Sequence, residues 1–177
     1  LPTDFESSKS SFVLEPGDSD SAVMETSIGQ GKTLVTPFHM ALIASAIAND
    51  GVLMKPYVID RITDAEGEVV EQYEPAEYKT LLSESDASVL QEYMRYVVEE
   101  GTATKLKSDS YEAAGKTGSA EFSSSSDATH SWFVGYAHNG EEPDIAVAVI
   151  VENSGVGSEY AVPIAKQIFD AYYTWEN

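Results

Sequence analysis

The chain has 177 residues, of which 42% are hydrophobic, and this composition suits one globular domain with a real core over residues 1–177. Its 30 acidic and 10 basic residues give a formal net charge of −20 at pH 7, which excludes nucleic acid and anionic membrane surfaces as main partners, because both are bound through Lys and Arg. The absence of cysteine excludes a disulfide framework and a thiolate metal site, and it fits an extracytoplasmic location.

The first segment, residues 1–24, is polar and rich in turn residues, and we expect an extended lead-in there rather than a packed element. It opens LPTDFESSKS, without an initiating methionine, a basic segment followed by an apolar run, or a stretch long enough to cross a bilayer. Any targeting signal or membrane anchor is therefore expected outside these residues.

Residues 25–110 are predicted to form a helical part with a small hairpin. Thr36 can cap a helix whose first residue is Pro37, and the stretch from there to NDG is apolar on almost every side, which indicates a buried helix. Residues 52–73 alternate in polarity around TDAEGE, which predicts a hairpin that turns at residues 64–67.

The stretch SESDASVLQEYMRYVVEEG gives the clearest amphipathic pattern. Ser83 and Asp86 match a capping box and Gly101 ends the pattern, so we expect a helix between them. The residues expected on its core-facing side are Ala87, Leu90, Met94 and Val97.

Residues 111–177 are predicted to form three strands and a C-terminal helix. The strands are expected at 111–122, 130–137 and 144–153, and the third is a nearly continuous apolar run, as in a strand covered on both faces. The helix is expected at 161–174. Its apolar stripe, expected to face the core, is Ile164, Ile168, Tyr172 and Trp175.

This order of elements predicts an α+β fold, in which helices pack on the faces of an antiparallel sheet. Three strands make a thin sheet for so much apolar helix. Either another segment completes the sheet or one edge stays open, and an open edge would favour a homo-oligomer.

The sequence AGKTGSAEF, on the first predicted strand of this sheet, carries the best candidate site. Lys116 supplies a point positive charge, the hydroxyls of Thr117 and Ser119 can donate to an anionic group, and Gly118 leaves room for a ligand along the strand. Such a strand can bind an extended peptide at its edge while its backbone N–H groups face a developing oxyanion. Taken alone, the motif also fits a solvent-facing lysine beside a bulge glycine.

Three further stretches flank this motif: SIGQGKTLVTPFHMALIASAIANDGVLMKP precedes it, and HSWFVGYA and IAVAVIVEN follow it. In this order, all four resemble the C-terminal half of the transpeptidase domain of penicillin-binding proteins, most closely the class B, cell-elongation and division type of Gram-positive bacteria. The resemblance covers residues 1–173. It implies a serine acyl-transferase that attacks the D-alanyl-D-alanine end of a peptidoglycan stem peptide, a reaction that beta-lactams trap at the acyl stage.

The resemblance implies roles for individual residues. Lys116 matches the lysine that supports the hydrogen-bond network around the nucleophile and adds positive potential. Thr117 and Ser119 match the hydroxyls that hold the substrate or antibiotic carboxylate, with Gly118 between them. The backbone N–H of Ser119 matches one of two oxyanion donors. The family often has threonine where Ser119 stands, and serine keeps the hydroxyl.

One part of the family's site is absent from the sequence. No serine stands three residues before any of the eight lysines, so the Ser-x-x-Lys nucleophile motif is missing, and so is the Ser-x-Asn motif. Thr102 and Thr104 come nearest, but in the family that segment lies outside the site, and a threonine nucleophile would need an adjacent base. We therefore expect one wall of a site without its nucleophile, in a chain that is inactive alone.

The three histidines have no metal-ligand spacing, and no metal or cofactor is expected. His39 lies on the apolar helix, where a core histidine is the simpler interpretation. His130 opens the second strand beside the site and can be either structural or a substrate contact. His138 follows that predicted strand.

Two other patterns are interpreted as structural. Gly29, Gln30 and Gly31 indicate a tight turn rather than a phosphate loop, because no strand precedes them and no Lys-Ser/Thr pair follows at the required spacing. The resemblance implies that this turn lies near the site. The acidic pairs Glu99-Glu100 and Glu141-Glu142 indicate solvated surface rather than paired catalytic acids.

The leading interpretation is therefore part of an extracytoplasmic peptidoglycan D,D-transpeptidase, with stem peptides and beta-lactams as ligands and an N-terminal half of the domain as partner. A second interpretation is a non-catalytic module that holds peptides or beta-lactams reversibly, like a sensor domain. A beta-lactamase fits less well, because no water-activating group is identifiable.

Overall fold

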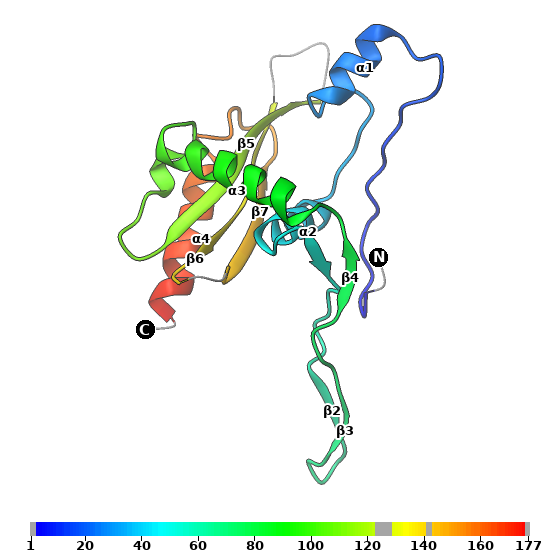
Figure 1. Cartoon of the computed structure of the whole chain (residues 1–177), viewed down its shortest axis with the longest axis vertical. Helices are drawn as coiled ribbons and strands as arrows, with labels where there is room; N and C mark the ends of the chain where they lie inside the picture. Colours follow the sequence, from blue (N-terminus) through cyan, green and yellow to red (C-terminus); the bar gives the residue numbers. More distant parts are fainter. Residues whose placement is uncertain (1–2, 123–128, 141–142, 176–177) are drawn as a thin grey trace.

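The computed structural model describes residues 3–122, 129–140 and 143–175. None of the helices in these ranges is long and apolar enough to cross a membrane. In chain order the elements are α1 (Asp20–Ser27), α2 (Pro37–Ala48), β1 (Val52–Met54), β2 (Arg61–Thr63), β3 (Val69–Gln72), β4 (Glu77–Thr80), α3 (Glu84–Glu99), the short 3₁₀ helix η1 (Thr104–Leu106), β5 (Glu112–Glu121), β6 (Thr129–His138), β7 (Ile145–Val151) and α4 (Ala161–Trp175) (Figure 1).

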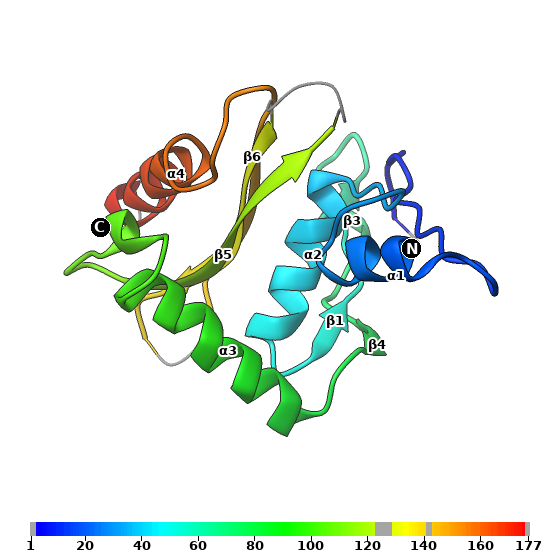
Figure 2. The same cartoon turned by 90° about the horizontal axis from the view of Figure 1, so that it is seen from above.

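The centre of the molecule is an antiparallel sheet in the order β5-β6-β7. Gly115 of β5 pairs with Gly135 of β6, and Val134 of β6 pairs with Ala148 of β7. Helix α4 covers one face of this sheet and α2 the other, while α3 packs against β5 (Figure 2). The predicted α+β fold is confirmed, and each of its three predicted strands lies within two residues of the observed bounds.

Side chains alternate between the two faces of the sheet, so the strands contribute to two hydrophobic clusters. On the α4 side, Phe133 and Phe169 are completely buried. On the α2 side, Tyr136 packs with Met94. The apolar run of β7 serves both clusters, through Val147 and Val149 on the first side and Ala146 on the second.

The two helix N-termini that were predicted from capping residues both carry the expected side-chain cap. The hydroxyl of Thr36 accepts a hydrogen bond from the backbone N–H of His39 at 3.1 Å, and Pro37 takes the first helical position. The hydroxyl of Ser83 accepts from the backbone N–H of Asp86 at 3.2 Å. Each cap satisfies a backbone donor that has no partner within the helix.

The lead-in is shorter than predicted, because residues 20–27 form α1. Ser19 caps this helix by accepting a hydrogen bond from the backbone N–H of Ala22 at 3.2 Å. No residue of α1 is buried. The prediction of an extended segment as far as Met24 is wrong, because a solvent-exposed helix leaves no periodic apolar signal in the sequence.

The predicted hairpin is the end of a longer arm that extends from the body (Figure 1). β2 pairs with β3 around the predicted turn, where Gly67 has a φ of +92° and its N–H donates to the carbonyl of Asp64 at 3.2 Å. β1 pairs with β4, which lies beyond the predicted hairpin. All of β4 is exposed, so no buried face marks it in the sequence.

Helix α4 turns a different face to the core from the one predicted. Ile164 is 39% exposed, Ile168 38% and Trp175 91%, while Tyr172 is partly buried against the core. The buried stripe contains small residues, which let the helix approach the sheet closely, and a hydropathy pattern gives these little weight. It consists of Ala161, Val162, Ala165, Phe169 and Tyr173.

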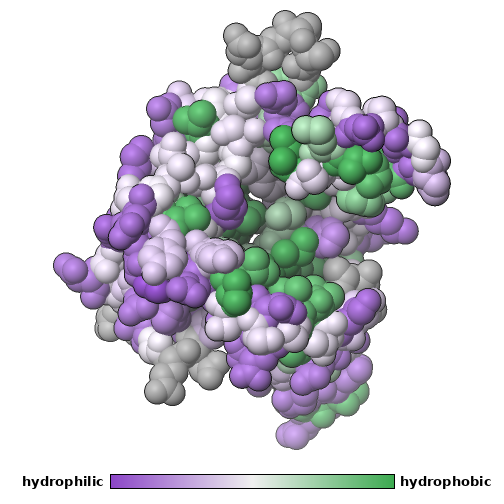
Figure 3. Space-filling model, turned by 45° about the horizontal axis from the view of Figure 1, so that its top comes forward, coloured by the Kyte–Doolittle hydropathy of each residue, from purple (hydrophilic) through white to green (hydrophobic). Residues whose placement is uncertain are grey.

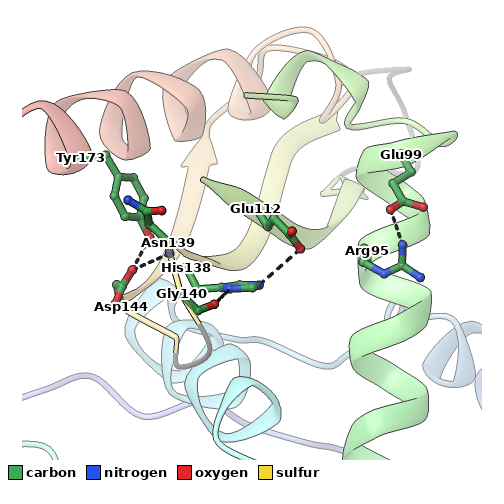
Figure 4. Close-up of polar contacts among 8 residues, drawn as sticks. All are labelled: Arg95, Glu99, Glu112, His138, Asn139, Gly140, Asp144 and Tyr173. Atoms are coloured by element: carbon green, nitrogen blue, oxygen red, sulfur yellow. Dashed lines mark hydrogen bonds and ion pairs between the residues drawn. The ribbon is translucent and has the colours of Figure 1, made fainter. Parts of the chain in front are cut away.

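At one end of the sheet, Asp144 fixes the β6–β7 connection to α4 (Figure 4). Its carboxylate accepts hydrogen bonds from the backbone N–H of Asn139 at 2.8 Å and from the hydroxyl of Tyr173 at 2.9 Å. His138 lies at the same end, with its Nε2 3.8 Å from the carboxylate of Glu112. Because Glu112 is the first residue of β5, this end is opposite to the one that carries the candidate motif.

Candidate active site

The segment from Lys116 to Ser119 lies in the second half of β5. This strand pairs with β6 on one side, and its other side faces no strand of the described residues. In an antiparallel pair, alternate residues direct their N–H and C=O away from the partner. Thr117 and Ser119 are such residues, because their carbonyls accept side-chain hydrogen bonds from Lys116 Nζ at 2.6 Å and from Gln30 Nε2 at 3.1 Å.

Two glycines allow a close backbone approach behind the motif. A Cβ on Gly157, in the segment before α4, would lie 2.5 Å from the carbonyl oxygen of Trp132 and 2.8 Å from that of Gly118. A Cβ on Gly118 would lie 3.2 Å from the Cβ of Trp132. The segment before α4 therefore supports the backbone of the motif directly.

Ser131 strengthens this support from the neighbouring strand. It pairs with Ser119 and is completely buried. Its hydroxyl donates to the carbonyl of Val156 at 3.0 Å and accepts from the backbone N–H of Ala161, also at 3.0 Å. One side chain thus joins β6 to the segment before α4 and to the first residue of that helix.

Thr102 makes a contact at the motif that sequence reasoning missed. Its hydroxyl oxygen lies 2.6 Å from that of Thr117. The expectation that this segment lies outside the site is therefore wrong. The partner is a hydroxyl and not a base, so the contact does not make Thr102 a nucleophile. No local pattern marks a contact between residues 15 positions apart.

The loop after α1 also reaches the motif, through the bond from Gln30 to Ser119. Gly29 and Gly31 both have a φ of +78°, which favours glycine, so the predicted tight turn is present. The backbone N–H of Gln30 donates to the carbonyl of Glu25 at 2.9 Å, which ties the loop to the end of α1.

The histidines that accompany the site have defined partners. Nδ1 of His130 accepts a hydrogen bond from the backbone N–H of Asn153 at 3.0 Å, so the neutral ring carries its proton on Nε2. The ring of His130 stacks on Phe122, with centroids 4.3 Å apart. Away from the motif, Nδ1 of His39 lies 2.8 Å from the hydroxyl of Ser10.

The acidic pairs lie away from the motif or outside the described residues. Glu99 forms an ion pair with Arg95 on the last turn of α3 (Figure 4). The pair at residues 141–142 lies outside the described residues. Within the described part of the chain, no group of three or more His, Asp or Glu residues is placed to hold a metal ion.

A cavity of about 350 Å³ lies between α3 and the start of β5, beside Arg95, Glu112 and Tyr136. Most of the residues that line this cavity are polar or charged, among them Asp50 and Gln91. The cavity is lined by residues from the first half of β5 and not by Lys116 or Ser119. We place the candidate site at the open strand edge instead, because the cation and the hydroxyls are there.

The motif can bind an anion and stabilise a developing negative charge. Thr117 and Ser119 are two residues apart, so their side chains share a face of the strand. Lys116 alternates to the other face, but its ammonium group reaches the edge at the carbonyl of Thr117. A carboxylate at this edge would meet a cation and two hydroxyl donors, with backbone N–H groups alongside.

Comparisons with known proteins show the family to which this chain is similar. A family model described as the penicillin binding protein transpeptidase domain matches residues 1–170. Over 148 residues the chain is 31% identical to the peptidoglycan D,D-transpeptidase PbpA of Mycolicibacterium smegmatis, covering 80% of this chain and 30% of that protein. Over 179 residues it is 30% identical to penicillin-binding protein 3 of Bacillus subtilis, covering 97% and 25%.

Solved structures give the same result. The imipenem acyl-enzyme complex of penicillin-binding protein A from M. tuberculosis superposes with a TM-score of 0.80 and 30% identity, covering 93% of this chain and 36% of that one. Penicillin-binding protein 2B from Streptococcus pneumoniae R6 gives a TM-score of 0.79 and 26% identity, covering 96% and 29%. The chain thus spans between 25% and 36% of the length of these four relatives.

Proposed function

The chain belongs to the penicillin-binding protein transpeptidase family, and we propose that it forms one wall of the acyl-transfer site of a peptidoglycan D,D-transpeptidase. The observation that carries the proposal is the open edge of β5. There, one cation, two hydroxyls and outward-facing backbone groups lie within the four residues from Lys116 to Ser119.

In the proposed reaction, a serine hydroxyl attacks the carbonyl carbon of the penultimate D-alanine of a stem peptide. The new O–C bond forms as the carbonyl electron pair moves to oxygen, and the backbone N–H of Ser119 donates to this oxyanion. Collapse of the intermediate breaks the C–N bond, and the proton that the serine hydroxyl gave up passes to the amine of the terminal D-alanine as it leaves. An amine of a second stem peptide then displaces the serine by the same steps.

The side chains of the motif bind the end of the stem peptide. The hydroxyls of Thr117 and Ser119 donate to the terminal carboxylate of the substrate, or to the carboxylate of a beta-lactam. Lys116 supplies local positive potential, which matters because a chain with a net charge of −20 otherwise repels an anionic ligand. Lys116 also supports the hydrogen-bond network around the nucleophile.

We propose that the nucleophile comes from outside these 177 residues, from an N-terminal half of the domain. The absence of a Ser-x-x-Lys motif supports this, as does the fraction of the relatives that the chain spans. The proposed location is the extracytoplasmic side of the membrane, with the anchor also outside these residues.

Labelling with a fluorescent penicillin tests the proposal. The isolated chain should give no covalent adduct, and the protein that also carries the upstream half should be labelled. In that longer protein, Lys116→Ala should lower the second-order acylation constant about 100-fold or more, because it removes charge stabilisation at the reacting group.

The exposed lysine of β4 provides the matched control, and Lys79→Ala should leave acylation unchanged. A covalent adduct on the isolated chain would contradict the missing nucleophile. Normal acylation of the Lys116→Ala variant would remove that residue from the mechanism.

The absence of a nucleophile in this sequence also favours the second candidate, a reversible binding module. That module predicts tight, non-covalent penicillin binding that stays non-covalent in the longer protein.

A further inference from the structure

Gln30 contacts the motif from a distant part of the chain. It precedes Ser119 by 89 residues, yet its Nε2 donates to the carbonyl of Ser119 at 3.1 Å. Ser119 is exposed and Gln30 is half-buried, so the bond lies at the surface of the open strand edge. A side chain of the protein itself therefore covers a backbone acceptor at the centre of the proposed site.

The position of this amide is the one that a bound strand would use. In a hydrogen-bonded antiparallel pair, two opposite residues exchange both of their N–H···O=C bonds. A ligand residue whose carbonyl accepts from the N–H of Ser119 would therefore bring its own N–H to the carbonyl of Ser119. Gln30 donates to that same carbonyl, so the side-chain amide occupies the place of a ligand amide.

The segment that carries Gln30 is loosely held by packing. The backbone of Gln30 is tied to Glu25 of α1, and no residue of α1 is buried. Met24 is 69% exposed and Ile28 77%, and Figure 3 shows hydrophobic residues at the surface where α1 lies in Figure 1. Few buried contacts oppose a movement of this segment, so Gln30 can leave the strand edge without disturbing the core.

We propose that Gln30 is a gate residue of the peptide site. In the empty site its amide occupies the carbonyl of Ser119, and a peptide that docks along β5 displaces it. The inference rests on the proposed function, because it takes the ligand to be an extended peptide at this edge. Gln30 weakens the binding of any ligand that offers an N–H to Ser119 and has no effect on a ligand that offers none.

The experiment compares two peptides on the 177-residue chain by NMR titration. One is an acetylated peptide that ends in D-alanyl-D-alanine, and the other is the same peptide with a methyl group on the nitrogen of the penultimate residue. Gln30→Ala should tighten binding of the first peptide about two- to tenfold, the range expected for one hydrogen bond, and leave the second unchanged. The side-chain amide signals of Gln30 should also shift when the first peptide binds.

Gln72→Ala is the matched control, because Gln72 also donates its side-chain amide to a backbone carbonyl, that of Asp60 at 3.0 Å, but lies on the arm. It should change neither affinity. Equal or weaker binding of the unmethylated peptide to Gln30→Ala would overturn the gate. If Lys116→Ala still weakened that peptide, the proposed function would stand without the gate. Absence of binding to the unsubstituted chain would overturn both.

Discussion

At the scale of single residues, the contact between Thr102 and Thr117 limits how the proposed site would hold a carboxylate. The two hydroxyl oxygens are 2.6 Å apart, and either one can be the donor. Thr117 can donate to a carboxylate only if its hydrogen is not already directed at Thr102. We therefore infer that in the ligand-bound site Thr102 is the donor and Thr117 the acceptor of this bond.

This inference predicts different effects for two substitutions. Thr102→Val keeps the shape of the side chain but removes the donor, so in the acylation-competent longer protein it should lower the acylation constant about two- to tenfold. Thr102→Ser keeps the hydroxyl and should restore most of the rate. Thr104→Val, two residues further on, is the control and should have no effect. Equal losses for the valine and serine variants would show that packing, and not the hydroxyl, matters.

The residues of the motif could be proposed from the sequence, but the residues that contact the motif from elsewhere in the chain could not. Lys116 to Ser119 are adjacent, so their chemistry can be interpreted without the fold. Gln30 and Thr102 contact residues of the motif that lie 89 and 15 positions further along the chain. These contacts depend on how the fold places distant loops beside β5. The missing Ser-x-x-Lys motif, by contrast, is a property of the sequence itself.

At the scale of elements, the pairing of β5 with β6 depends on two glycines that lie opposite each other. Gly115 pairs with Gly135, and the ring of Phe133 lies over both. A Cβ on Gly115 would lie 2.3 Å from Cζ of Phe133 and 2.7 Å from the carbonyl oxygen of Val134. The strand that carries the motif therefore has no room for a side chain directly before Lys116.

Gly115→Ala should consequently destabilise the fold by about 1–3 kcal/mol, the usual range for overpacking a core. Urea denaturation measures this, and the midpoint should fall while the slope stays constant. Gly140→Ala is the matched control, because a Cβ there meets nothing within 4 Å and should change stability little. A Gly115→Ala variant as stable as the unsubstituted chain would show that Phe133 can move aside.

Elements with local signals could be predicted, and those set by packing could not. The caps at Thr36 and Ser83 and the apolar run of β7 predict their elements from a few neighbouring residues. The buried face of α4 could not be predicted from hydropathy, because Ala161 and Ala165 are buried by close approach to the sheet. α1 is not packed on the core at all, so hydrophobic periodicity does not reveal it.

At the scale of the whole molecule, burial of Tyr136 beneath α2 and α3 makes stability depend on pH. Burial, with a smaller contribution from the charge of Asp50, raises the pKa of Tyr136 from 10.0 to about 12. Between these values the unfolded chain has lost the phenolic proton and the native protein has kept it. The native state then binds more protons, so stability must fall as the pH rises.

The prediction is a loss of up to about 2–3 kcal/mol between pH 10 and pH 12 that is specific to this tyrosine, since one pKa unit corresponds to about 1.4 kcal/mol. Urea denaturation at several pH values should show a steeper decline for the unsubstituted chain than for Tyr136→Phe. Because all other titrating groups are common to the two proteins, their contributions to the pH dependence of stability cancel in this comparison. Parallel declines would mean that Tyr136 titrates normally in the native protein.

The last prediction concerns self-association through the outer edge of β7 and the exposed side of α4. β7 pairs with β6 on one side and with no strand of the described residues on the other, and Ile168 on α4 is 38% exposed. Both features favour self-association, but two chains with a net charge of −20 repel each other. Sedimentation velocity should therefore show a fraction of dimer that rises with protein concentration and with added salt, because salt screens the repulsion.

Ile168→Lys should weaken this dimer, while Val70→Lys, at a 68% exposed position on the arm, should not. A chain that stays monomeric at high salt and high concentration would contradict the prediction.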